Sequence, residues 1–498
     1  MRKTIRIDSK DNVAVALQTL RKGETLQIDG EAILVPEEIL AGCKFALTDI
    51  PEGEKIIKYG FPIGRAVENI RRGAAVDHKN LRSLLSGIED YSDLTVTDTP
   101  PSPPLGKATF KGFLRPDGQA GIRNELWVIP TVGCVNGIAG KIVEEFKALN
   151  KFDGIDGVYA FSHPYGCSQL GEDNENTKKI LRGMVGHPNA GGILIVGLGC
   201  ENNQPHEFME YCGIQAGERV SLLVCQEVEG DEVAAGVKLL EDLYMKAKND
   251  RRDNVPLSKL RIGLKCGGSD GFSGLTANPL LGLFTDYICD VEGGSAVMTE
   301  VPEMFGAETI LMKRCANREV LKKTVKLIND FKEYYLSHGQ PVGENPSPGN
   351  KAGGISTLEE KSLGCIQKGG STIVTGVVEY GDRALKPGLS LLNAPGNDLV
   401  ASTALAAAGC QIVLFTTGRG TPFNTFVPTV KISTNSPLAD KKPHWIDFDA
   451  GGLVEGEEKE TALERFIGTV RDIAEGRPTA SEKRLAHEIA IFKIGVTL

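Results

Sequence analysis

Five polar, glycine-containing stretches of the sequence adjoin predicted strands and carry side chains that could bind a small polar ligand. They contain Arg123, Asn124, Cys134 and Asn136 around a strand at 125–130; His163, Tyr165, Cys167 and Gln169; Cys200, Glu201, Asn202 and Asn203; Cys266, Ser269, Asp270, Ser273, Thr276 and Asn278; and Thr416, Thr417 and Arg419. Ligands of open α/β sheets bind beyond the carboxyl ends of the strands. One such stretch would be an ordinary turn, but five of them predict a shared cleft.

Residues 344–365, ENPSPGNKAGGISTLEEKSLGC, contain two prolines, four glycines and almost no apolar periodicity. This pattern predicts a loop without regular helix or strand. Its composition is varied, whereas that of a flexible linker is simple. This variety favours a fixed loop that presents Asn350, Glu360 and Lys361 to the same cleft. A long polar surface loop is the alternative interpretation.

The side chains in these stretches suit a small ligand that carries several hydroxyl groups and a carboxylate. Amides and hydroxyls would bind the hydroxyl groups, and Arg419 would bind the carboxylate through its planar, two-pronged donor. The candidate binding residues are Arg123, Asn124, Asn202, Asn203, Ser269, Asp270, Asn350, Thr417 and Arg419. Neither GxGxxG after the first strand nor GxxxxGK[ST] occurs, so no motif supports a dinucleotide or a nucleoside triphosphate.

His163 is one of seven histidines and lies in a turn after a strand, four residues before Cys167. This context allows a role in proton transfer or metal binding, whereas a hydrogen-bonded structural histidine is the alternative. Glu300, Glu303 and Glu308 could be ligands, but we interpret them as acidic residues that stabilise helix N-termini.

The overall composition excludes several classes of protein. The chain has 498 residues and a formal net charge of −9, which argues against nucleic-acid and membrane-surface binding. Its apolar runs are too short to span a bilayer, and its N-terminus does not resemble a secretory signal. The eleven cysteines include no CxxC pair, which favours reduced thiols in the cytoplasm.

The predicted elements indicate a multidomain α/β protein. Residues 1–92 form a β-rich module, in which 12–20 is predicted as a short helix, and residues 93–107 form a proline-rich linker. Strands alternate with helices over 108–250 and again over 251–498, which predicts two α/β units with mainly parallel sheets.

Several longer motifs resemble those of the altronate/galactarate dehydratase family, and the resemblance runs from residue 1 to the final IFKIGVTL. The stretches that carry it include IKYGFPIG, GIRNELWVIPTVGCVNGIA, SHPYGCSQLG, VGLGCENN, CGGSDGFSGLTANP, TEVPEMFGAE, ENPSPGNKAGGISTLEEKSLGC, TGRGTPF and HWIDFDAG. The resemblance implies an N-terminal SAF (β-clip) domain and a divalent metal, Fe(II) or Mn(II). It also implies loss of water from D-altronate to give 2-dehydro-3-deoxy-D-gluconate.

The SAF module departs from the pattern of the family it resembles. Where the family typically has GHKFA and VHxHN, this chain has Cys43 in the first motif and Asp77 and Lys79 in the second. Cys43, Asp77 and His78, with Cys167, could still bind a metal, since thiolate, carboxylate and imidazole all bind Fe(II). Alternatively, the module is purely structural here.

Dehydration of a sugar acid requires a base that removes the proton α to the carboxylate and an acid that protonates the leaving hydroxyl. His163, Glu360 and Lys361 are the candidates for these roles. A metal would stabilise the enediolate that forms.

Other activities remain compatible with the sequence. The chain could be a galactarate dehydratase or a sulfolactate-type lyase of the same family, or a non-catalytic sugar-acid sensor. Cys134, Cys167, Cys200, Cys266 and Cys365 also leave an iron–sulfur dehydratase open. A homo-oligomer, most simply a dimer, is expected, with no nucleic-acid or membrane partner.

Overall fold

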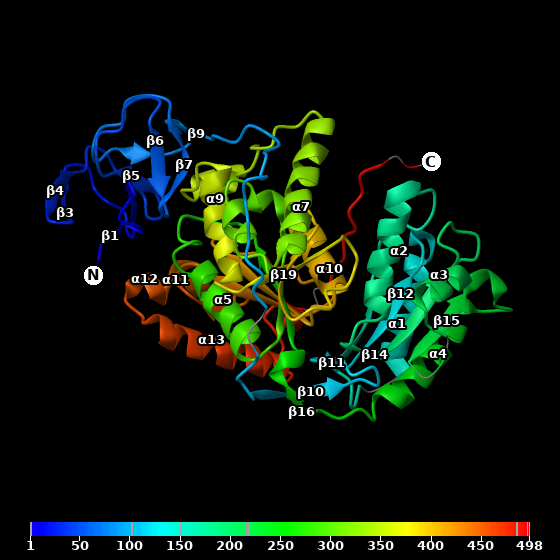
Figure 1. Cartoon of the computed structure of the whole chain (residues 1–498). Helices are drawn as coiled ribbons and strands as arrows, with labels where there is room; N and C mark the ends of the chain where they lie inside the picture. Colours follow the sequence, from blue (N-terminus) through cyan, green and yellow to red (C-terminus); the bar gives the residue numbers. More distant parts are fainter. Residues whose placement is uncertain are drawn as a thin grey trace.

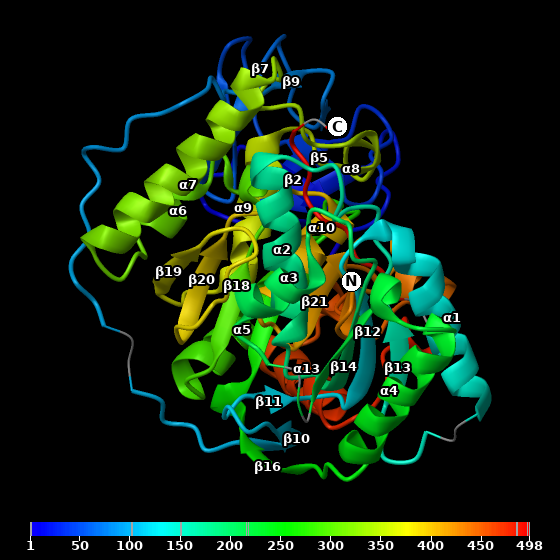
Figure 2. The same ribbon diagram turned by 90° about the vertical axis from the view of Figure 1, so that its right-hand side faces the viewer.

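The computed structural model describes residues 2–100, 103–149, 152–215, 217, 219–484, 487–495 and 497. Within these residues the chain folds into an N-terminal β unit and two α/β units (Figures 1 and 2). The N-terminal unit, blue in Figure 1, lies against one end of the C-terminal unit, and the middle unit lies on the opposite side. In this described part of the chain, no helix combines the length and apolar character needed to cross a membrane.

The N-terminal unit consists of short antiparallel strands around a small apolar core. Its sheets are β1-β2-β5-β8, β3-β4 and β6-β7-β9. The strands are β1 (Thr4–Ile5), β2 (Val13–Ala16), β3 (Thr25–Ile28), β4 (Glu31–Leu34), β5 (Lys44–Ala46), β6 (Lys55–Lys58), β7 (Phe61–Ala66), β8 (Ala75–Val76) and β9 (Leu81–Arg82). The helix predicted over 12–20 is wrong, because all of Val13–Ala16 is buried in a strand between β1 and β5.

The middle unit has the parallel sheet β13-β12-β14-β15 with helices on both faces. Its strands are β12 (Glu125–Pro130), β13 (Gly157–Ala160), β14 (Ala190–Gly197) and β15 (Val220–Val224). Its helices are η1 (Gly133–Val135), α1 (Asn136–Leu149), α2 (Gly171–Val185), α3 (Pro205–Cys212), η2 (Cys225–Glu227) and α4 (Glu232–Ala247). A small antiparallel sheet of β10 (Thr109–Leu114), β11 (Ala120–Gly121) and β16 (Asp253–Pro256) pairs the segments where the chain enters and leaves the unit.

The C-terminal unit is built on the parallel sheet β19-β20-β18-β17-β21-β22-β23. Its strands are β17 (Arg261–Cys266), β18 (Ser295–Met298), β19 (Val374–Val378), β20 (Gly388–Leu392), β21 (Ile412–Thr417), β22 (Thr429–Ser433) and β23 (Phe448–Asp449). The α-helices are α5 (Ala277–Asp286), α6 (Glu308–Met312), α7 (Arg318–Ser337), α8 (Pro348–Ala352), α9 (Leu358–Cys365), α10 (Asp398–Ala407), α11 (Ser436–Lys441), α12 (Gly452–Glu455) and α13 (Lys459–Ala474). Shorter helical turns are η3 (Leu257–Lys259), η4 (Tyr287–Val291), η5 (Val301–Met304), η6 (Ile366–Gly369) and η7 (Glu482–Arg484).

The prediction that 344–365 contains no regular structure is wrong, because this stretch holds α8 and α9. The side chains of Ser347 and Thr357 cap the two helices by accepting bonds from the backbone amides of Asn350 and Glu360. Every residue of α9 is buried. Because α9 is buried on all sides, its polar side chains contact other parts of the protein instead of solvent, and its sequence shows no amphipathic period.

Helix α9 is also the element on which the N-terminal unit docks. The ammonium groups of Lys44 (β5) and Lys58 (β6) each lie 2.8 Å from a carboxylate oxygen of Glu360, and all three side chains are at most 2% exposed. The hydroxyl of Thr357 donates to the carbonyl of Ile63, 2.5 Å away. A Cβ at Gly271 would lie 1.9 Å from the carbonyl oxygen of Gly42, so the two backbones meet with no space between them.

The two lysines determine the charge of Glu360. Burial alone would raise the pKa of this carboxyl, but Lys44 and Lys58 outweigh burial and lower the pKa to about 2. Burial in turn lowers the pKa of Lys44, whereas Glu360 outweighs burial at Lys58 and raises its pKa. Glu360 is therefore ionised at neutral pH and bound by the N-terminal unit, so it is not available for the catalytic role predicted for it.

We expect Glu360→Gln to destabilise the folded chain by about 3–5 kcal/mol, the range for removing one partner of a buried ion pair. Because the pKa of Glu360 lies below its ordinary value of 4.5, its contribution is present at neutral pH and declines as the pH falls from about 4.5 towards 2. Urea unfolding at several pH values measures both effects. Glu319→Gln removes the exposed pair with Lys323 and should leave stability nearly unchanged; equal losses in the two variants would contradict the assignment.

Candidate active site

A cavity of about 640 Å³ opens between the carboxyl ends of the central strands of the C-terminal sheet and the segment that contains α8. Its walls come from the end of β17, from η5, from the start of α10 and from residues 340–351. The side chains that line it are Cys266, Glu303, Tyr335, Gln340, Pro341, Glu344, Asn345, Pro346, Ser347, Pro348, Asn350, Lys351, Lys361, Asn397 and Asp398. This is the edge at which parallel α/β sheets bind ligands.

Two thiols and a carboxylate meet at the inner wall of this cavity, which Cys266 and Glu303 line and behind which Cys365 lies. The Sγ atoms of Cys266 and Cys365 lie 3.2 Å apart, and Oε2 of Glu303 lies 3.2 Å from the first and 3.0 Å from the second. All three side chains are buried. In the part of the chain that the structure describes, this is the one group in which three potential metal ligands lie within 4.8 Å of one another.

Lysine side chains surround this group. Lys368 Nζ lies 3.0 Å from Cys266 Sγ and 3.0 Å from Glu300, and Lys361 Nζ donates to Oε1 of Glu303 at 2.8 Å. Lys265 is the penultimate residue of β17, and it pairs with Glu300 and, at 2.8 Å, with Asp398. Each ammonium group therefore has a carboxylate partner, which stabilises these charges in a buried site.

The lysines keep Glu303 ionised. Burial alone would raise the pKa of its carboxyl, but Lys361, Lys265 and Lys368 together outweigh burial and lower the pKa to about 2. Conversely, burial would lower the pKa of Lys361, but Glu303 and the nearby thiols outweigh it and raise the pKa. At neutral pH the cavity wall thus presents a carboxylate and an ammonium group side by side.

Glu300 organises this charge network from a strained position. Its backbone has φ 67°, in the left-handed region that non-glycine residues rarely adopt. The carboxylate accepts bonds from Lys265, from Lys368 and from the backbone amide of Cys266. Such strain persists only where the surroundings hold it, and it is concentrated at functional sites.

The donor set of Cys266, Glu303 and Cys365 fits the divalent metal that the sequence resemblance implies. Thiolates and a carboxylate suit Fe(II), whereas Mn(II) prefers oxygen ligands. Metal binding requires deprotonated thiols. The hydrogen bond with Cys266 and burial raise the pKa of the Cys365 thiol well above its ordinary value, so a bound metal would have to displace that proton.

The metal ligands predicted in the N-terminal unit do not come together in the same way. Cys43, Asp77 and His78 do not form a group of three ligand atoms within 4.8 Å in the described chain, and Cys167 belongs to the middle unit. Asp77 instead accepts a bond from the backbone amide of Lys79 at 2.7 Å, which closes its own turn. His78 is exposed.

The binding residues predicted in the C-terminal unit lie at or near the cavity. The amide of Asn350 donates to the carbonyl of Ser269 at 2.8 Å, which joins α8 to the loop after β17. Asp270 accepts bonds from Ser273, Thr434 and Asn435, so its carboxylate is fully used. Thr417 accepts a bond from the amide of Gly420, and Arg419 is exposed and packs on Gly268, a residue of the cavity wall.

Arg123 and Asn124 lie at the opposite edge of a sheet, because they precede β12 instead of following it. The guanidinium of Arg123 is buried and pairs with Glu482 at 2.8 Å. The amide group of Asn124 is used by Arg115 and by the carbonyls of Gly154 and Ala247. Both residues therefore hold segments together, in place of the predicted contact with a ligand.

His163 is likewise structural. Its Nε2 lies 2.8 Å from the carbonyl of Pro130, and its Nδ1 accepts a bond from the amide of Tyr165. With both ring nitrogens in use and the pKa lowered by burial, the ring is a neutral tether between two loops. Asn202 and Asn203 connect the same loops, since Asn202 accepts from the amide of Ser168 and Asn203 donates to the carbonyl of Thr131.

The predicted single cleft is thus divided in two. Residues 344–365 converge with the loops after β17 and β21, as expected, whereas the clusters around His163 and Cys200 belong to the middle unit and contribute no side chain to the cavity in the described residues. The sequence analysis missed Lys265 and Lys368, and it interpreted Glu300 and Glu303 as acidic residues at helix N-termini. A lysine inside the apolar run RIGLKC was the available signal, because a buried ammonium group requires an acidic partner.

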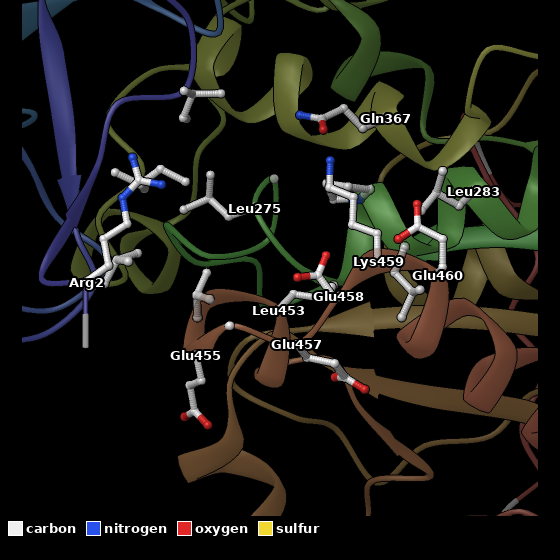
Figure 3. Close-up of a pocket in the computed structure, with 18 residues that line it drawn as sticks. Arg2, Leu275, Leu283, Gln367, Leu453, Glu455, Glu457, Glu458, Lys459 and Glu460 are labelled. Atoms are coloured by element: carbon white, nitrogen blue, oxygen red, sulfur yellow. The ribbon is translucent and has the colours of Figure 1, made fainter. Parts of the chain in front are cut away.

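A second cavity, of about 720 Å³, lies between the N-terminal unit and the segments that contain α5, α12 and α13 (Figure 3). Arg2 approaches it from one side and Glu455, Glu457, Glu458 and Glu460 from the other. The thiols and buried ion pairs of the first cavity are not among its lining residues.

Comparisons with known proteins agree with this architecture. Three family models match the chain. The model of the altronate/galactarate dehydratase SAF domain matches residues 2–84, and that of the D-galactarate dehydratase/altronate hydrolase second domain matches residues 112–248. The model of the D-galactarate/altronate dehydratase C-terminal region matches residues 257–497.

The chain is also similar over its full length to characterised relatives. It is 55% identical to altronate dehydratase of Bacillus subtilis (strain 168), with 100% of both chains covered, and 52% identical to altronate dehydratase of Escherichia coli (strain K12), with 99% of both covered. It is 33% identical to the L-threo-forming galactarate dehydratase of Escherichia coli (strain K12), over 98% of this chain and 96% of the relative. The chain therefore belongs to the altronate/galactarate dehydratase family.

Proposed function

We propose that this protein is a hydro-lyase that removes water from D-altronate to give 2-dehydro-3-deoxy-D-gluconate. The observation that carries the proposal is the cavity at the end of the C-terminal sheet, where an ionised carboxylate, two thiols and a protonated lysine meet. Full-length identity above 50% to two proteins named altronate dehydratase supports the choice of substrate.

The cavity has the polar groups that a sugar acid requires. Asn345, Asn350, Asn397 and Gln340 offer amides for its hydroxyl groups, and Lys351 and Lys361 offer ammonium groups for its carboxylate. Arg419, near the wall at Gly268, remains a proposed carboxylate contact.

Lys361 is proposed to act as the acid of the reaction. Its Nζ is held by Glu303 at 2.8 Å and by the side-chain oxygen of Asn345 at 3.2 Å, at the wall of the cavity. Because its pKa is raised, it keeps its proton at neutral pH and can place it beside the departing β-hydroxyl or stabilise the enediolate.

Asp398 is proposed as the base that removes the α-proton. Its carboxylate lies in the cavity wall, is 40% exposed and is paired with Lys265 at 2.8 Å. A Cβ at Gly267 would lie 2.6 Å from Oδ1 of Asp398, so only glycine at that position admits the carboxylate.

Cys266, Glu303 and Cys365 are proposed to hold a divalent metal, with Fe(II) preferred over Mn(II). Such an ion would supply a Lewis acid for the carboxylate and α-hydroxyl of the substrate. Glu303 Oε1 would remain bound to Lys361, which links the metal ligand to the acid.

We also propose that the protein acts in the cytoplasm, most simply as a homodimer. All eleven cysteines are free, and thiols at a catalytic site require a reducing compartment. Gel filtration with light scattering measures the oligomeric state.

The substrate proposal is tested by incubating the anaerobically purified chain with Fe(II) and a panel of hexonates, hexarates and sulfolactate, with 2-keto acid formation as the readout. We expect D-altronate to have the highest kcat/KM. A preference for galactarate, or sulfite release from sulfolactate, would assign one of the sibling activities instead. Altronate binding without turnover would indicate a sensor.

Removal of metal should abolish turnover. We expect chelator-treated protein to be inactive and Fe(II) to restore activity, because the enediolate requires charge neutralisation. Cys266→Ser and Cys365→Ser should each weaken this restoration by at least about tenfold in the Fe(II) concentration required. Full turnover by protein shown to be metal-free by elemental analysis would refute the metal site.

Lys361→Met should change the pH profile as well as the rate. Lys361 makes the largest of the lysine contributions that lower the pKa of Glu303 to about 2, so its loss should raise that pKa and move the acid limb of kcat/KM to higher pH. The matched control is Lys351→Met, which removes another lysine of the same cavity wall and should leave the position of the limb unchanged. An unshifted acid limb in Lys361→Met would show that the lysine does not control Glu303.

A further inference from the structure

Three exposed cysteines stand at one edge of the middle unit, outside the site described above. Cys134, Cys167 and Cys200 follow β12, β13 and β14, which are neighbours in the parallel sheet, and all three are free and exposed. Cysteine is normally among the most buried residue types. Exposed thiols in glycine-rich turns are placed where they can react or bind a metal.

The loops that carry these cysteines are fastened to one another. The amide of Gly133 donates to the carbonyl of Tyr165 at 2.8 Å, and the amide of Asn203 donates to the carbonyl of Gly166 at 3.0 Å. The buried carboxylate of Glu201 accepts bonds from the hydroxyl of Thr131 and from the amide of Leu198, at 2.7 and 3.0 Å. The three loops thus form one rigid platform, which also contains the His163 tether.

Each of the three cysteines is directly preceded by a glycine that this platform requires. A Cβ at Gly133 would lie 2.9 Å from the carbonyl oxygen of His163, and one at Gly166 would lie 2.1 Å from that of Thr131. At Gly199, where φ is +122°, a Cβ would lie 2.9 Å from Oε1 of Gln226. The glycines therefore allow the loops to meet closely beneath the exposed thiols.

We propose that Cys134, Cys167 and Cys200 bind an iron–sulfur cluster, held by three thiolates at the edge of the middle sheet. The spacing excludes a single tightly held ion, because the three Sγ atoms do not form a group within 4.8 Å in the described residues. A cluster is larger than one ion and bridges thiolates that lie farther apart. With three protein ligands, one iron of a four-iron cluster remains open to a small oxygen ligand.

This site is distinct from the thiols at Cys266 and Cys365, which belong to the C-terminal unit.

The experiment is anaerobic purification of the full chain, followed by reconstitution with Fe(II) and sulfide and removal of unbound iron. We expect about four acid-labile sulfide and, with the ion of the proposed mononuclear site included, about five iron per chain, with broad visible absorption and, after reduction, an electron paramagnetic resonance signal. Cys134→Ser, Cys167→Ser and Cys200→Ser should each decrease the sulfide content, and the triple variant should carry none. Because these side chains are exposed, the variants should retain the thermal unfolding midpoint of the original chain.

Two variants provide matched controls. Cys212→Ser changes a half-buried cysteine of the same unit, and Cys266→Ser changes the proposed mononuclear site; both should retain the full cluster. Absence of labile sulfide after reconstitution, a single iron without sulfide, or equal sulfide in the triple variant would overturn the proposal. Since the readout needs no substrate, its failure would leave the proposed dehydration untouched.

Discussion

The buried contact between Glu360 and the lysines of the N-terminal unit is the constraint on which the rest of the structure depends. Helix α9 buries Leu358 and Leu363 in the core, and the ion pairs of Glu360 fix it against the N-terminal unit. The residue after Glu360 is Lys361, and Cys365 follows one turn later. The contact that attaches the SAF unit therefore also sets the position of the acid and of one thiol in the cavity.

Charge balance governs the second layer of this arrangement. Lys265, Lys361 and Lys368 would each be costly to bury alone, and so would Glu300 and Glu303; together they neutralise one another. The cluster therefore keeps both an ionised carboxylate and protonated lysines in a site largely closed to water. Replacing any one member changes the protonation of the others, so its residues act as a unit more than as separate contributors.

Whether an element could be predicted depends on whether its sequence has a recognisable pattern of apolar and polar residues. The parallel strands were predictable, since β12, β14, β17 and β21 are apolar runs that end in glycine-rich turns. Helix α9 was not, because burial on every side removes the amphipathic period by which helices are detected. Arg123 and Asn124 were misplaced because adjacency to a strand does not say at which end of it a residue lies. His163 was misjudged because a sequence does not show that backbone groups occupy both ring nitrogens.

The distance along the chain between the partners of the docking contact has a consequence for synthesis. Lys58 and Glu360 are separated by 302 residues, so the N-terminal unit leaves the ribosome long before its partner helix exists. At about 5–20 residues per second, the delay is roughly 15–60 s. Throughout that interval Lys44 and Lys58 must remain solvated on an open surface of the nascent SAF unit. The charges that are buried in the finished protein are thus left without their partner until most of the chain has been made.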